Sequence, residues 1–184
     1  MPRIQVIPPD EATGRLKEIY DEVKQKRGAI ANVHAIHSLH PETMRTHIDF
    51  YMSVLYAKSG LSRQERETIA VAVSQANGCA YCVAHHVDAL SRYQKDEGIL
   101  NSLRAGQDHA SLSERERAII SFARRLTLAP ASSREQGIGE LRSAELTDEE
   151  ILMATLTAAY FNFVNRVVHC LGVEEEHQPA SYNY

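Results

Sequence analysis

Hydrophobic residues recur at helical spacing along most of the chain. One stripe, behind the helix-starting Pro41, consists of Met44, Ile48, Tyr51, Met52 and Leu55. Steps of three and four residues place such side chains on one face of an α-helix. The same analysis predicts helices at about 10–26, 32–39, 41–60, 62–76, 79–94, 96–105, 113–128, 133–143 and 147–171. Because strand-like alternation is scarce, the predicted fold class is all-α, a single-domain helical bundle.

Three of these helices begin with the same signal. Ser62, Ser113 and Thr147 are each preceded by leucine and followed three residues later by glutamate. This arrangement predicts a capping box, in which the two side chains bind each other's backbone N–H, with the leucine as a hydrophobic staple. The first two segments, LSRQER and LSERER, agree further. A weak internal repeat of helix pairs therefore stays open, although three well-capped helices are the simpler interpretation.

Composition is that of an ordinary globular protein. The chain has 184 residues, 43% of them hydrophobic, with 9 glycines and 6 prolines. This length and composition favour one folded domain over residues 1–184, with a core at about 10–172 and a polar tail at 173–184.

Charge and hydropathy argue against nucleic-acid and membrane partners. The formal net charge is −4, without a basic patch, which gives no electrostatic footprint for nucleic acid. The most apolar segment, 151–173, is interrupted by Asn162, Asn165, Arg166 and His169, a polar content unusual for a transmembrane helix. The first residues lack the apolar region of a signal peptide. The expected location is therefore the cytoplasm.

The segment NGCAYCVAHH, residues 77–86, contains the most reactive side chains. A helix turns about 100° per residue. Relative to Cys82, Cys79 then lies at about +60° and His86 at about +40°, whereas His85 lies at about −60°. Cys79, Cys82 and His86 therefore share one face. The helix N-terminus and the histidine both favour the thiolate form, so the pair is expected to be redox-active.

The cysteine pair also admits other interpretations. Zinc could bind Cys79 and Cys82 with His86 as third ligand and Glu67 or another histidine as fourth. Structural zinc sites usually draw on a second Cys/His pair, and the third cysteine, Cys170, is isolated in an apolar helix where we expect it in the core. Zinc therefore ranks below redox chemistry, and two inert buried cysteines rank lower still.

Glu67 is the acid that we expect beside this pair. It lies in line with Ala70, Val71 and Ser74 on the apolar side of its predicted helix. A buried carboxylate needs a partner, and His86 on the next helix is the natural one. The alternative is a solvated surface glutamate.

Together these residues resemble a known motif. Glu67, eleven intervening residues, Cys79-x-x-Cys82, three more residues and His86 are similar to the motif of alkylhydroperoxidase D-like proteins in the carboxymuconolactone decarboxylase superfamily. The segments 32–42 and 161–166 resemble its peroxidase-related branch. The resemblance covers most of residues 10–172 and implies an all-helical homo-oligomer, a trimer or hexamer. Because both cysteines are present, the decarboxylase side of the superfamily is disfavoured.

The resemblance implies a role for each residue. Cys82 would be the peroxidatic cysteine and Cys79 the resolving one, with His86 and Glu67 as a proton relay. The substrate would be a hydroperoxide, and the electron donor a dithiol on a lipoyl-bearing or thioredoxin-like protein. No cofactor or metal is expected. The alternatives are a dithiol–disulfide oxidoreductase or redox sensor with little peroxide turnover, and a zinc-bound helical assembly module.

Two polar groups stay without a defined role. His34, His37, His40 and His47 do not form one tight face, and we interpret them as structural or pocket-lining rather than metal ligands. The stripe of Asn162, Asn165, Arg166 and His169 could bridge subunits or line the cysteine pocket, and we favour the subunit interface.

Overall fold

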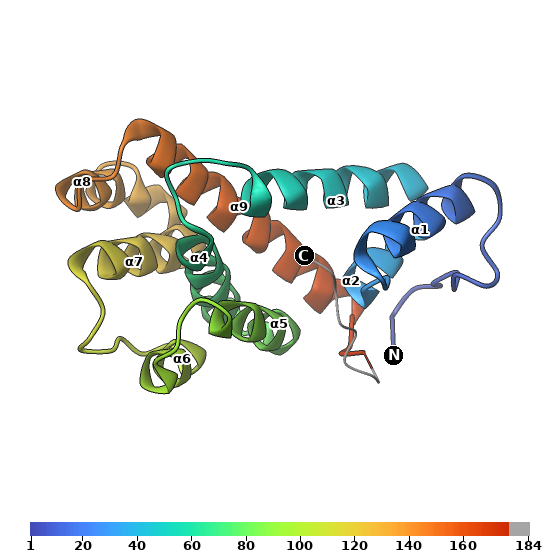
Figure 1. The fold of residues 1–184 in the computed structure, drawn as a ribbon, viewed down its shortest axis with the longest axis horizontal. Coiled ribbons are helices and arrows are strands. Elements are labelled where there is room, and N and C mark those ends of the chain that lie inside the picture. Colours follow the sequence, from blue (N-terminus) through green and yellow to red (C-terminus); the bar gives the residue numbers. More distant parts are fainter. Residues whose placement is uncertain (177–184) are drawn as a thin grey trace. The chain divides into compact units, whose positions relative to one another are not determined.

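The computed structural model describes residues 1–176 and is helical throughout (Figure 1). Its elements are α1 (Gly14–Arg27), α2 (Asn32–Ala35), α3 (Pro41–Tyr56), α4 (Arg63–Ala76), α5 (Ala80–Ser91), α6 (Glu97–Arg104), α7 (Glu114–Leu128), the 3-10 helix η1 (Pro130–Ser133), α8 (Gln136–Ser143) and α9 (Asp148–Leu171). No strand occurs among residues 1–176. The predicted all-α class is confirmed.

The chain divides into two compact units. One contains residues 1–52 and the described residues from 166 onward, and the other contains residues 53–165. Helices α3 and α9 each contribute residues to both. The expectation of a single domain over 1–184 stays a prediction, and most of the polar tail predicted at 173–184 lies outside the described residues.

In the unit of residues 53–165, α4 is the central helix. It packs against α5, α6 and α7, and α7 packs in turn against α8 and η1. All residues of α4 from Arg66 to Ser74 are buried, so α4 is covered on every side rather than on one stripe. A polar side chain on such a helix needs a hydrogen-bond partner from the residues around it.

The three predicted capping boxes are present. Ser62, Ser113 and Thr147 each accept a hydrogen bond from the backbone N–H of the glutamate three residues on, at 3.2, 3.2 and 3.3 Å. The carboxylates of Glu65, Glu116 and Glu150 accept the reciprocal bonds at 2.7, 2.9 and 2.7 Å. The preceding leucines, at 61, 112 and 146, are buried.

One arginine joins the starts of three helices. Arg115, in the first turn of α7, donates from Nε to Glu65 Oε1 at 2.6 Å and from Nη2 to Glu150 Oε1 at 2.7 Å. Glu65 belongs to the start of α4 and Glu150 to the start of α9. Two of the capping glutamates, Glu65 and Glu150, therefore also hold the N-termini of α4, α7 and α9 beside one another.

Helix α9 is the one described helix that is long and apolar enough to span a membrane, with a mean hydropathy of 1.3 in its best window. Half of that window is buried inside the protein. Its Asn165 is fully buried and hydrogen-bonded to α4. These features are typical of a core helix.

In the other unit, α1 packs on α3. The buried cluster consists of Ala12, Leu16, Ile19, Tyr20, Val23, Met44 and Ile48. Helix α1 begins at Gly14, later than the predicted start at residue 10, because the chain first forms a turn in which Glu11 N donates to Pro8 O at 3.1 Å.

Three of the four clustered histidines meet in this unit. His47 Nδ1 and His37 Nε2 lie 3.1 Å apart, and the ring centroids of His34 and His47 are 5.3 Å apart. His34 and His47 are buried, whereas His40 is exposed. Within residues 1–176 no group of three His, Cys, Asp or Glu side chains is arranged to hold a metal ion, and the contacts support the structural interpretation.

This histidine cluster makes stability depend on pH. Burial lowers the pKa of His34, and burial together with the charges of His37 and Arg27 lowers the pKa of His47 to about 3. The unfolded chain protonates these rings near the ordinary value while the folded chain does not. Stability is therefore fully present above about pH 6.5 and falls below it, by about 1.4 kcal/mol per pH unit for each such histidine.

We expect the melting temperature to fall steadily between pH 7 and pH 5, and the fall to be shallower in His47→Gln. The exposed neighbour provides the control, because His40→Gln should keep the wild-type slope. An identical pH dependence in His47→Gln and wild type would contradict this origin.

Candidate active site

A tight turn between α4 and α5 begins the site. Gly78 adopts φ 68°, its N–H donates to Gln75 O at 2.9 Å, and Cys79 N donates to Ser74 O at 2.8 Å. These two bonds form a Schellman motif, in which a glycine in the left-handed region ends the helix. Cys79 follows at once as the N-cap of α5.

The two cysteine sulfurs meet because Cys79 lies outside the helix. Cys79 has φ −85° and ψ 90°, an extended conformation, whereas the sequence predicted that it would lie within the first turn. The sulfurs of Cys79 and Cys82 are 2.8 Å apart without a disulfide between them. Two positions three apart within a helix would hold their Cβ atoms about 5–6 Å apart. At the N-cap, Cys79 is not bound to this helical spacing, and its sulfur lies in contact with that of Cys82.

The cysteine pair shares its protons. The hydrogen bond between the two sulfurs lowers the pKa of Cys79 against the opposing effect of burial. The same hydrogen bond and burial raise the pKa of Cys82. The reduced pair thus releases one proton readily and keeps the other between its sulfurs. The sequence assigned the attacking thiolate to Cys82, and that assignment stays a prediction, because the lowered pKa belongs to Cys79 while the histidine lies one helical turn beyond Cys82.

Glu67 and His86 lie together as predicted. Glu67 is fully buried, and its Oε2 is 2.7 Å from His86 Nδ1. The alternative of a surface glutamate is therefore wrong. Burial acts to raise the pKa of the Glu67 carboxyl, but the charges and hydrogen bonds of His86 and Arg63 outweigh it and lower that pKa. An ionised carboxylate only accepts hydrogen bonds, so Nδ1 of His86 carries the hydrogen between them, and Nε2 is the ring nitrogen left for proton transfer.

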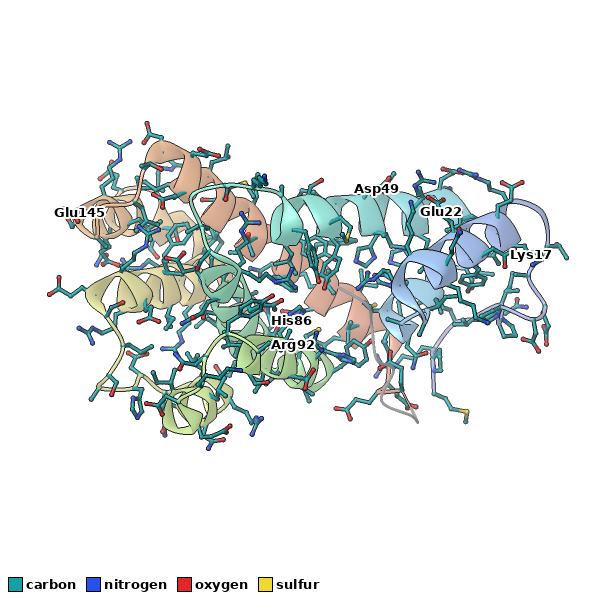
Figure 2. The ribbon with its side chains drawn as sticks, in the orientation of Figure 1. Lys17, Glu22, Asp49, His86, Arg92 and Glu145 are labelled. Atoms are coloured by element: carbon teal, nitrogen blue, oxygen red, sulfur yellow. The ribbon has the colours of Figure 1, made fainter. Side chains whose placement is uncertain are left out.

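Sequence reasoning missed Arg63. Its Nε donates to Glu67 Oε1 at 2.8 Å and its Nη2 to Tyr56 Oη at 2.8 Å. The guanidinium carbon also lies 3.7 Å from the centroid of the Tyr56 ring. The spacing of four residues between Arg63 and Glu67 was a usable signal. After His86, Arg63 is the second group that keeps the buried carboxylate ionised, and it binds one carboxylate oxygen while His86 (labelled in Figure 2) binds the other.

The asparagines of α9 belong to the cysteine site. Asn165 is fully buried, donates to Ser74 Oγ at 3.2 Å and accepts from Asn77 Nδ2 at 2.9 Å. Asn162 accepts from Asn77 Nδ2 at 3.1 Å. Both bind partners within their own chain, which supports the other interpretation, that they line the cysteine pocket, whereas the subunit interface stays a prediction.

The other two members of the polar stripe on α9 are exposed. Arg166 and His169 face outward, and so does Cys170. The expectation that Cys170 lies in the core is wrong, because its position falls on the uncovered side of the helix.

The zinc alternative finds little support in this geometry. Arg63 and His86 occupy both carboxylate oxygens of Glu67. In the part of the chain that is described, no cluster of metal-binding side chains has the arrangement of a site.

Comparison with known proteins gives consistent matches. Residues 41–125 match the model of the carboxymuconolactone decarboxylase family, a range that includes both cysteines, Glu67 and His86. The uncharacterized protein YdfG of Bacillus subtilis is 26% identical over 132 residues, 72% of this chain and 88% of that protein.

Solved structures share the fold. The alkylhydroperoxidase AhpD core of a peroxidase-related protein from Ralstonia eutropha is similar with a TM-score of 0.84 and 27% identity, over 96% of this chain and 93% of that one. The debrominase Bmp8 is similar with a TM-score of 0.78, over 95% of this chain and 92% of that one. The two sequences are 19% identical, so this similarity shows a shared fold alone.

The turn before Cys79 can be tested with two glycines. A Cβ at Gly78 would meet no atom within 4 Å, but its φ is +68°, so Gly78→Ala should cost about 1–2 kcal/mol of stability through the backbone alone. Gly139, in the interior of α8, also has open space, and Gly139→Ala should stabilise by about 0.5–1 kcal/mol. Urea unfolding of both variants measures the difference. Equal effects of the two changes would contradict the role of Gly78.

Proposed function

Since the chain belongs to the alkylhydroperoxidase D-like proteins of the carboxymuconolactone decarboxylase superfamily, we propose that it is a thiol-dependent peroxidase. The observation that carries the proposal is the pair of sulfurs 2.8 Å apart on the helix that also presents a histidine held by a buried carboxylate. This arrangement joins a nucleophile, a resolving thiol and a proton acceptor.

In the first step, the Cys82 sulfur attacks one oxygen of the hydroperoxide. The O–O bond breaks, the sulfur becomes a sulfenic acid, and the other oxygen leaves as an alkoxide. His86 takes the thiol proton at Nε2 and returns it to the alkoxide, which leaves as an alcohol. Glu67 stabilises the charge on the ring during the transfer, because it binds Nδ1 at 2.7 Å.

In the second step, the Cys79 sulfur attacks the sulfenic sulfur. A disulfide forms and the hydroxyl group leaves as water after gaining a proton. Because the sulfurs of the reduced pair already lie close together, they need to move little to form the disulfide. A dithiol then returns two electrons by exchange, and we propose a lipoyl-bearing or thioredoxin-like protein as the donor. A cytoplasmic trimer or hexamer is part of the same proposal.

Two features bear on the order of the cysteines. Cys82 lies one helical turn from His86, which favours Cys82 as the attacking sulfur. Cys79 has the lowered pKa. The proton between the sulfurs can move from one to the other, so we keep Cys82 as the peroxidatic residue and test the order directly.

The alternative function is a dithiol–disulfide oxidoreductase or redox sensor. It uses the same pair and the same relay, but peroxide is a poor substrate. The two functions therefore use the same site and differ in the rate of peroxide reduction.

The first test is steady-state peroxide consumption by pre-reduced protein with a dithiol donor. We expect wild type to turn over and both Cys79→Ser and Cys82→Ser to lose turnover. A sulfenic acid should be trapped in Cys79→Ser and not in Cys82→Ser, whereas Cys170→Ser serves as the matched control with wild-type activity. Absence of turnover, with the pair still cycling between dithiol and disulfide, would favour the exchange enzyme. Trapping only in Cys82→Ser would reverse the order.

The relay makes a separate prediction. Glu67→Gln keeps the size of the side chain but removes the charge that supports His86, so turnover should fall by about 10²-fold or more. Glu97→Gln, at the exposed start of α6, should leave turnover unchanged. Wild-type rates in Glu67→Gln would remove Glu67 from the mechanism.

A further inference from the structure

A line of side-chain amides leads from α7 to the cysteine pair. Thr127 Oγ1 donates to Ala123 O at 2.8 Å, so its lone pairs are free to accept. Asn162 Nδ2 donates to Thr127 Oγ1 and to Ala158 O, both at 3.0 Å. The line continues through Asn77 to Asn165, which is hydrogen-bonded to the cysteine pair.

The direction of every amide in this line is determined. A backbone carbonyl can only accept, so Ala158 O requires the nitrogen of Asn162 and turns the Asn162 oxygen toward Asn77. Asn77 must then present its own nitrogen, which donates to Asn162 Oδ1 at 3.1 Å and to Asn165 Oδ1 at 2.9 Å. With its oxygen taken, Asn165 directs its nitrogen the other way, to Ser74 Oγ at 3.2 Å.

Asn165 and Ser74 both act on the reactive sulfurs. The largest effects on the two pKa values are the mutual hydrogen bond of the thiols, burial, the backbone N–H of Cys82 acting on Cys79, and the charge of Cys79 acting on Cys82. After these, hydrogen bonds from Asn165 act on both sulfurs and one from Ser74 acts on Cys82, all toward a lower pKa. Asn165 and Ser74 are both fully buried. Donors fixed in a water-poor site stabilise an anion more strongly than mobile water does.

We propose that Asn165 and Ser74 form a donor site for the thiolate of the cysteine pair, and that Asn77 and Asn162 are positioning residues that keep the Asn165 amide turned toward the sulfur. This inference deepens the proposed function, since it assigns the groups that stabilise its nucleophile. The site uses neutral amides and a hydroxyl, so it adds no charge to the buried surroundings of Glu67. Its function is to favour the anion, whereas that of His86 is to carry the proton.

The test is a pH titration of the thiolate by its ultraviolet absorbance, in a Cys170→Ser background that leaves only the pair. Asn77→Leu does not touch a sulfur but frees the Asn165 oxygen to turn toward it. The titration midpoint should rise by about one pH unit, a tenfold smaller thiolate fraction below the midpoint. Asn165→Asp, which replaces the donor by an acceptor of the same size, should raise it further.

Asn101→Leu, on the exposed side of α6, is the matched control and should keep the wild-type midpoint. Thermal melting of each variant separates the inference from a purely structural role, which would lower the melting temperature without moving the midpoint. If Asn165→Asp does not fold, Asn77→Leu and Thr127→Val decide, with Thr127→Val giving a smaller rise. An unmoved midpoint in folded Asn77→Leu and Thr127→Val would overturn the inference.

The titration needs neither peroxide nor a donor protein. A raised midpoint in a protein without peroxide turnover would support the donor site and reject the proposed function. Turnover with unmoved midpoints would do the reverse.

Discussion

The reversal of the chain between α4 and α5 determines where the reactive groups lie. Three residues, Asn77 to Cys79, separate the two helices, and the Schellman bonds to Ser74 and Gln75 leave this segment one compact path. The same turn sends the Asn77 side chain toward α9 and places the Cys79 sulfur against Cys82. A longer connection would satisfy the helix ends equally well, but it would separate the amide from the thiol.

Two polar networks flank this turn, and they differ in kind. Arg63, Glu67 and His86 form a charged network in which each partner compensates for the burial of the carboxylate. Removing one member of such a network leaves an uncompensated buried charge. The loss of folding stability is then larger than the stability that the intact network contributes. The asparagine network is neutral, and hydrogen bonds join each of its members to the next. Charge for moving protons and fixed dipoles for holding an anion are thereby kept on separate side chains.

Sequence reasoning succeeded where the signal was local. A capping box is formed by residues only three positions apart in the sequence, so the starts of α4, α7 and α9 were predicted closely. The contact between Glu67 and His86 was also predicted, because a buried acid needs a partner and few basic groups were on the correct face. The position of Cys79 outside the helix was not, since an N-cap and a first-turn residue differ by one step in the chain.

The role of Asn165 depends on tertiary packing and could not be read from its own helix. A polar stripe on an apolar helix indicates a buried partner, but not whether that partner lies in the same chain. The prediction that Cys170 lies in the core failed for a related reason, because the hydrophobicity of α9 is similar on its covered and uncovered sides. Arg63 had a helical spacing signal that we did not use.

Arg115 has a consequence for the length of two helices. It joins Glu65 of α4 to Glu150 of α9, and twelve residues further along the chain from each, Asn77 at the C-cap of α4 meets Asn162 of α9. The two helices therefore run in the same direction between two cross-links that are about 18 Å apart along each axis. Inserting one residue between the cross-links in either helix would advance it by about 1.5 Å and rotate it by about 100°. Both segments must accordingly keep the same number of residues, whereas the loops around α6 are under no such restriction.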